Sequence, residues 1–111
     1  MKLVTLGQVR QHCRVDFDDE MLKVYAEAAE QAAEDFLGRR VFPDTAALAD
    51  AVLGAYAGDD PMVVNQAIVA AVLLIAGHLY RNREAVSSEA ATELPMGAHA
   101  LLWPHRVGLG V

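Results

Sequence analysis

Apolar residues recur at steps of three and four along two long stretches of the chain, which is the spacing that places them on one face of a helix. Asp18 or Asp19 suits the N-cap of the first of these helices, and Gly38 suits the position just beyond its end at Leu37. The expected apolar face consists of Met21, Tyr25, Ala28, Ala29, Ala32 and Phe36. The pattern therefore predicts a long helix that ends at Leu37.

The same helix carries a stripe of charged residues. At 100° per residue this stripe is about 80° wide. Its members are Glu20, Lys23, Glu27, Glu30 and Glu34. A stripe of this kind is typical of a solvated face, and the alternative is an acidic wall that faces a channel or a partner.

The second long stretch is apolar on nearly all sides. Asp60 as N-cap and Pro61 as first helical residue predict a helix from Pro61 to about Arg83, roughly 34 Å long at 1.5 Å per residue. Its two apolar stripes are Ile68, Val72, Ile75 and Leu79, and Val69, Leu73, Gly77 and Tyr80. Because the other helices of a 111-residue chain are short, we expect another subunit to cover part of this helix.

Shorter elements flank the two long helices. Thr5 and Gln8 fit a capping box, which predicts a short helix from Leu6 to Cys13. The other expected segments are a link at Arg14–Phe17, a linker at Arg39–Asp44, an alanine-rich helix from Thr45 to about Tyr56, a loop at Ser87–Glu93, and one helical turn at His99–Trp103 before Pro104. The fold class is therefore all-α: a small bundle of two long helices with short N-terminal and C-terminal helices, in a single domain at 1–111.

Composition and charge reduce the number of possible classes of function. Hydrophobic residues make up 54% of the chain, above the usual range of about 45–50%, which favours burial against other subunits. The net charge of −6 disfavours general binding to duplex DNA, because phosphate neutralisation needs clustered Lys and Arg. The lone Cys13 excludes an intramolecular disulfide and favours a reducing compartment, which we expect to be the cytoplasm. The longest apolar run, Ala67–Gly77, is shorter than the ~20 residues of a membrane span, so we expect no membrane contact.

The sequence offers little support for metal binding or catalysis. His12 and Cys13 are adjacent, and neighbours on a helix point about 100° apart, so they do not form a nucleophilic pair. No Cys or His pair has the spacing of a zinc site, and no glycine-rich phosphate loop is present. We therefore expect no metal, no cofactor and no enzymatic activity.

A small DNA-binding regulator is the alternative function. The basic clusters are Arg39-Arg40 and Arg81-x-Arg83, and both fall at predicted helix ends. Cations at that position stabilise the helix dipole by about 0.3–1 kcal/mol each, which explains them without nucleic acid. The helix that ends at Leu37 is acidic where a recognition helix carries Arg, Asn or Gln.

Several short segments, in this order and spacing, resemble the head–tail connector proteins of tailed bacteriophages. They are Thr5-Leu6, Arg14-Val15-Asp16 with Asp18-Asp19, Ala28-Ala29-x-x-Ala32 to Phe36-Leu37-Gly38-Arg39, Ala70–Ile75 leading into His78-Leu79-Tyr80-Arg81-Asn82-Arg83-Glu84, and Leu101-Leu102-Trp103-Pro104-His105-Arg106. The Tyr-x-Asn-Arg-Glu element is the most specific. The region from about Asp44 to Asp59 is longer and richer in alanine than the family pattern.

The resemblance implies a structural adaptor of a phage or prophage, made in the bacterial cytoplasm and placed at the virion neck. Such a protein forms a ring beneath the twelve-fold portal, extends the channel through which DNA passes without specific binding, and docks the next head-completion or tail protein. Residues 86–111 would then be a loop and a C-terminal docking segment, ordered on docking. The residues expected at subunit or portal interfaces are Arg14, Arg39, His78, Tyr80, Arg81, Arg83, Trp103, His105 and Arg106. Arg81 or Arg83 is expected to pair with a carboxylate such as Asp16, Asp18 or Asp19.

Overall fold

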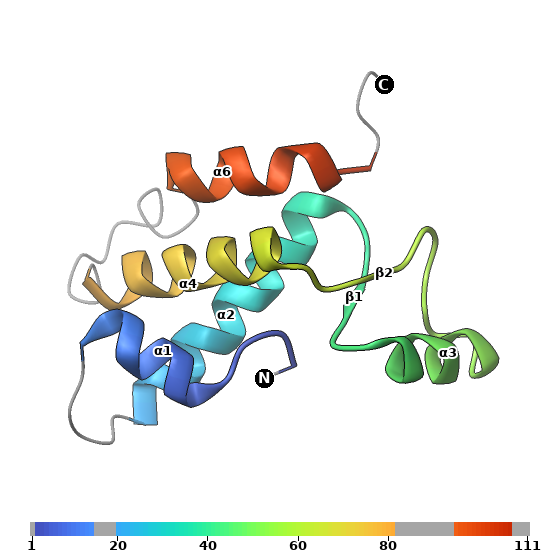
Figure 1. The fold of residues 1–111 in the computed structure, drawn as a ribbon, viewed down its shortest axis with the longest axis horizontal. Coiled ribbons are helices and arrows are strands. Elements are labelled where there is room, and N and C mark those ends of the chain that lie inside the picture. Colours follow the sequence, from blue (N-terminus) through green and yellow to red (C-terminus); the bar gives the residue numbers. More distant parts are fainter. Residues whose placement is uncertain (1, 15–19, 82–94, 108–111) are drawn as a thin grey trace.

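Helix α4 (Gln66–Arg81) lies at the centre of the fold, with α6 (Met96–Leu102) on one side and α1 (Leu6–Cys13) on the other. Helix α2 (Glu20–Leu37) crosses behind it (Figure 1). The computed structural model describes residues 2–14, 20–81 and 95–107. Within them the chain is a small helical bundle, which confirms the all-α class.

Helix α4 is covered within a single chain. Every residue from Ala67 to Tyr80 is buried or half-buried against α1, α2 and α6. Small residues let these helices approach closely, and a Cβ added at Gly77 would lie 3.0 Å from Nε2 of His12. The expectation that covering this helix requires another subunit is therefore wrong, because short helices cover it when they pack this closely.

Helix α4 begins five residues later than the sequence pattern predicts. Residues Met62–Val63 form strand β2, which pairs in parallel with β1 (Val41–Phe42). The side-chain oxygen of Asn65, rather than Asp60, caps the helix by accepting the N–H of Ile68 at 3.0 Å. The helix is described as far as Arg81, and the predicted end at Arg83 lies outside the described residues.

Helix α1 has the predicted bounds, and its capping box is confirmed. The amide of Gln8 donates to Oγ1 of Thr5 at 3.1 Å, and the amide of Thr5 donates to Oε1 of Gln8 at 2.8 Å. The predicted N-caps Asp18 and Asp19 and the predicted loop Ser87–Glu93 lie outside the described residues.

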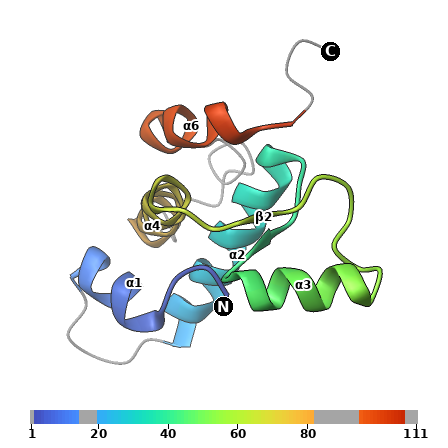
Figure 2. The ribbon, with the colours of Figure 1, turned by 45° about the vertical axis from the view of Figure 1, so that its right-hand side comes forward.

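Helix α3 (Thr45–Leu53) begins where predicted, with Asp44 as its N-cap, and ends three residues before the predicted Tyr56. It stands away from the bundle and packs on a small apolar cluster of its own, formed by Phe42, Ala51 and Ala57 (Figures 1 and 2). The C-terminal segment is more helical than predicted: α6 continues into the 3-10 helix η1 (Trp103–His105).

The buried face of α2 matches the predicted one only in part: Ala29 is buried and Ala32 and Phe36 pack against the core, as predicted. Leu22 and Leu37 are fully buried, whereas Met21 and Ala28 are exposed. The buried apolar residues are Leu22, Ala26, Ala29, Ala33 and Leu37. On this alanine-rich helix, two overlapping sets of residues recur at helical spacing. The set that contains Leu22 and Leu37 faces the core. The end of the helix at Leu37 is confirmed, with Gly38 at φ +70°.

Candidate functional site

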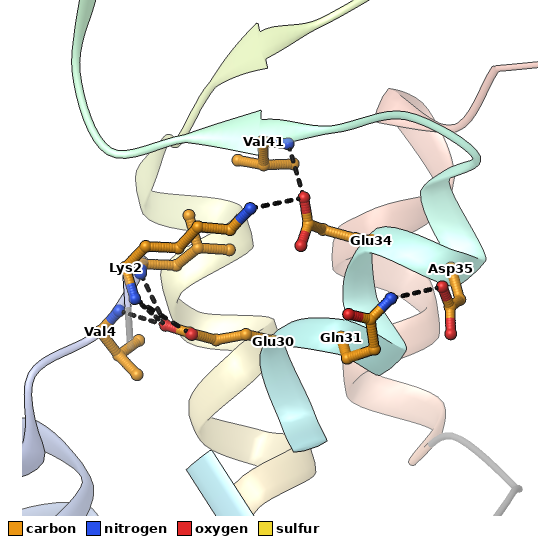
Figure 3. Close-up of polar contacts among 8 residues, drawn as sticks. Lys2, Val4, Glu30, Gln31, Glu34, Asp35 and Val41 are labelled. Carbon is orange, nitrogen blue, oxygen red and sulfur yellow. Dashed lines mark hydrogen bonds and ion pairs between the residues drawn. The ribbon is translucent and has the colours of Figure 1, made fainter. Parts of the chain in front are cut away.

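The carboxylate of Glu30 holds the N-terminal segment against the middle of α2 (Figure 3). Its side chain is buried, with 5% of the residue exposed. Oε2 accepts the backbone N–H of Leu3 at 2.6 Å and that of Val4 at 2.9 Å, and the amide of Lys2 contacts both oxygens at 3.1 and 3.2 Å. The carboxylate thus satisfies three consecutive backbone donors.

Glu34, one turn further along α2, makes a second connection on the same face. Its Oε2 accepts a hydrogen bond from the ammonium group of Lys2 at 2.9 Å and another from the backbone N–H of Val41 at 2.9 Å. Glu30 is therefore not part of a solvated stripe or an open acidic wall, because its carboxylate is buried on backbone groups of its own chain. Glu34 is only partly buried and binds the backbone of Val41. Sequence reasoning missed this role, although Glu30 falls at helical spacing from the buried Ala26 and Ala33.

Arg39 joins three parts of the chain just beyond the end of α2. Its guanidinium donates to the carbonyl of Asp60 at 2.8 Å, to the Asp60 carboxylate at 3.1 Å and to the carbonyl of Pro61 at 3.3 Å. It also donates to the carbonyl of His105 at 3.3 Å. With only 17% of its side chain exposed, Arg39 serves contacts within the chain.

The C-terminal segment caps the last carbonyls of α2. The guanidinium of Arg106 donates to the carbonyl of Phe36 at 3.0 Å, and the amide of Val107 donates to the carbonyl of Leu37 at 2.9 Å. His105 approaches the side chain of Asn65 at 3.5 Å. The expectation that the Trp103 segment orders only on docking is wrong, because η1 already packs on its own chain.

Aromatic side chains form a surface cluster on α6 and η1. His99 stacks on Trp103 with ring centroids 5.4 Å apart, and the ring of Phe36 meets His99 edge-on at 5.0 Å. The guanidinium of Arg106 lies 5.2 Å from the ring of Phe36 and 5.6 Å from that of Trp103. Trp103 remains 44% exposed, and Met96, at the start of α6, is 87% exposed. We call Met96, His99, Trp103 and Arg106 the α6 surface.

The remaining predicted residues lie at the other end of the bundle, where α1 ends, α2 begins and α4 ends. Tyr80 packs edge-on against Tyr25 with centroids 6.3 Å apart, and His78 is half-buried. Arg14 and Arg81 are exposed. Burial raises the pKa of the Cys13 thiol, and the nearby guanidinium of Arg81 partly opposes this shift. Arg83 and the suggested partners Asp16, Asp18 and Asp19 lie outside the described residues.

The predicted site residues thus divide into two groups. Arg39, Trp103, His105 and Arg106 meet near the C-terminal end of α2, and Arg14, Tyr80 and Arg81 lie near its N-terminal end. An open polar groove of about 500 Å³ lies beside the first group. It is lined by Gln31, Glu34, Asp35, Gly38, Arg39, Arg40, Gly58 and Asp59.

Neither a metal site nor a membrane span is found in residues 2–14, 20–81 and 95–107. No three side chains of His, Cys, Asp or Glu in these ranges gather closely enough to hold a metal ion. No helix described there is long and apolar enough to cross a membrane.

The described residues define a small all-α protein with exposed aromatic and apolar side chains. The family model of the phage gp6-like head–tail connector proteins matches residues 3–106, and the chain belongs to this family. It is therefore a structural head–tail connector of a bacteriophage. No curated protein and no solved structure matches the chain.

Proposed function

We propose that this connector assembles as a ring beneath the twelve-fold portal at the virion neck, after synthesis in the cytoplasm of the bacterial host. The family match over residues 3–106 is the observation that carries this proposal. The ring extends the channel for DNA and presents a surface to the next head-completion or tail protein. Residues 1–111 act as one connector domain in this assembly.

The charge of the chain suits a channel that DNA passes without being held. A ring built from chains of net charge −6 repels phosphate on average, whereas tight DNA binding depends on clustered cations. Glu30 and Glu34 contribute to this overall charge, but their carboxylates accept hydrogen bonds from backbone N–H groups of their own chain.

The α6 surface is the proposed docking surface for a neighbour in the neck, either the portal or the next protein. Interfaces concentrate binding energy in large rigid aromatic residues. Trp103 is held by His99 on one side and is still 44% exposed, and Met96 is almost fully exposed. A side chain already fixed in this way loses little conformational freedom on binding.

The alternative, a DNA-binding regulator, loses support from the contacts of Arg39, which belongs to one of its two basic clusters. Arg39 donates to carbonyls and a carboxylate of its own chain. Its guanidinium is therefore not fully available for phosphate contacts.

Electron microscopy of the purified chain, alone and mixed with the portal of the same phage, tests the proposal. We expect rings, or rings seated on the portal, with a central opening. A chain that stays monomeric and does not bind the portal would contradict the proposed assembly. A salt-sensitive shift of duplex DNA by the monomer would instead favour the regulator.

A further inference from the structure

Helix α3 belongs to an arm that stands away from the bundle (Figures 1 and 2). The arm, residues 43–60, leaves from β1 and returns to β2, and α3 packs on its own small apolar cluster. The strand pair forms the base of the arm. In it the amide of Met62 donates to the carbonyl of Arg40 at 3.0 Å, and the amide of Val64 donates to that of Phe42 at 2.8 Å.

The return of the arm to the bundle has an uncommon backbone conformation. Ala55 and Asp60 have positive φ angles of +60° and +53°, which residues with a side chain rarely adopt. Such conformations persist where neighbouring groups hold them. At Asp60 the neighbour is Arg39, whose guanidinium binds the carbonyl of this residue at 2.8 Å and its carboxylate at 3.1 Å. Arg39 therefore fixes the point at which the arm rejoins the bundle.

The same guanidinium also holds the C-terminal part of the chain. It donates to the carbonyl of His105 at 3.3 Å. We call residues 105–107 the C-terminal clasp, because this segment donates to the last carbonyls of α2. A second contact, 3.5 Å between the side chains of Asn65 and His105, joins the clasp to the segment that follows β2. The base of the arm and the clasp are thus held by one group of contacts around Arg39.

We infer that Arg39 couples the base of the arm to the C-terminal clasp, so that the two open and close as one cooperative unit while the rest of the bundle stays folded. The arm stands away from the bundle, and the clasp contains the last residues that the structure describes. Peripheral segments of this kind open locally, without unfolding of the whole domain. Because coupling is reciprocal, a change at either part should be measurable at the other.

The coupling gives the α6 surface an effect on a distant part of the chain. Arg106 belongs both to that surface and to the clasp, and it lies 5.6 Å from the ring of Trp103. A partner that binds there and holds the clasp closed should therefore stabilise the strand pair at the base of the arm. This consequence rests on the proposed docking surface, whereas the coupling itself does not.

Two variants weaken one side of the coupling each. Arg106→Ala removes a guanidinium bond to the end of α2 and loosens the clasp. Asp60→Asn weakens the contact with Arg39, and asparagine tolerates the positive φ angle there. The matched controls are Lys23→Ala, which removes an exposed cation near the start of α2, and Asp59→Asn, at the exposed neighbour of Asp60.

Hydrogen exchange of the full-length chain measures the opening of each part. The amide of Met62 reports the base of the arm, and the amide of Val107, which bonds to the carbonyl of Leu37, reports the clasp. The amide of the fully buried Val72 in α4 reports unfolding of the bundle. We expect Met62 and Val107 to share one free energy of opening, below that of Val72.

Each variant should also speed exchange at the part that it does not touch. We expect Arg106→Ala to raise the exchange rate at Met62, and Asp60→Asn to raise that at Val107, by about fivefold, as for the loss of one hydrogen bond. In an Arg39→Lys background, where one ammonium group does not hold both parts, Arg106→Ala should act at Val107 alone. Both controls should leave the two rates unchanged.

An unchanged rate at Met62 in Arg106→Ala would overturn the coupling, and so would an effect that persists in the Arg39→Lys background. The consequence for docking is tested with the portal and with the next neck protein. Where binding protects Trp103 from quenching, exchange at Met62 should slow in the wild type, and an unchanged rate would overturn the transmitted effect. Unchanged quenching with both proteins would overturn the docking surface and the transmitted effect, while the coupling is still decided by the variants.

Discussion

The Glu30 carboxylate accepts the backbone N–H of Leu3 at 2.6 Å, across 27 positions of sequence. The same oxygen accepts the N–H of Val4, and both groups are buried. Leu3 and Val4 are therefore part of the folded core rather than of a loose extension.

Replacement of Glu30 by glutamine should lower the free energy of unfolding by about 1.5–3 kcal/mol, the usual range for buried hydrogen bonds to a charged group. The amide keeps one acceptor oxygen but in either orientation turns an NH2 group toward the backbone N–H of Lys2, which contacts both carboxylate oxygens. Urea unfolding measures the change. Asp35→Asn is the matched control on the same helix, because Asp35 is exposed and its amide oxygen still accepts from Gln31. Equal stability of the two variants would contradict the anchoring role of Glu30.

Replacement of Arg39 by lysine should destabilise the protein by about 1–2 kcal/mol, because one ammonium group does not reach acceptors on Asp60, Pro61 and His105 together. Hydrogen exchange should report faster exchange at the amide of Met62, which bonds to the carbonyl of Arg40 in the β1–β2 pair. The same substitution at the exposed Arg40 is the control and should change stability by less than about 0.5 kcal/mol. A comparable loss in both variants would mean that the arrangement around Arg39 contributes no special stability.

Trp103 is the sole tryptophan, so its fluorescence reports directly on the α6 surface. On binding of the docking partner, acrylamide quenching should fall, since the exposed part of the ring becomes covered. Trp103→Ala should weaken that binding by about 2 kcal/mol, roughly 30-fold in Kd, while ring formation is retained. Unchanged quenching in the assembled neck would exclude Trp103 as the anchor.

The reactivity of Cys13 should follow its raised pKa. Burial favours the neutral thiol in the folded state, so this contribution to stability is present below the unfolded pKa of about 8.5 and is lost as the pH rises through the higher folded pKa. Alkylation requires the thiolate, and the midpoint of its pH profile should be higher in the folded chain than in urea. Arg81→Gln removes the opposing charge and should raise this midpoint further, whereas the exposed Lys23→Gln should leave it in place. A lower midpoint in Arg81→Gln would contradict the contact.

The features predicted correctly from the sequence depend on neighbouring residues. The capping box of Thr5 and Gln8, the start of the helix at Thr45 and the stop at Gly38 each depend on residues within one turn of the helix that they begin or end. The start of α4 depends instead on pairing between residues that are 21 positions apart. Two-residue strands carry no periodicity, so Pro61 resembles a helix start although the chain there is extended.

In the candidate site too, local features could be predicted from the sequence and long-range contacts could not. The arginines just beyond α2 mark a helix end, as the sequence indicates. The particular carbonyls that Arg39 and Arg106 bind come from segments 21 to 70 positions away and are fixed by tertiary packing. The same holds for Glu30, whose burial depends on the N-terminal segment folding back over α2.

The bond from Val107 to Leu37 has a consequence for the order of synthesis. Helix α2 leaves the ribosome before the segment that caps its last carbonyls, because that segment lies 70 positions further along the chain. The C-terminal end of α2 therefore stays open until Arg106 and Val107 have emerged. A fusion or truncation that displaces these two residues would act on folding before it acts on any partner, so the competent building block contains both of them.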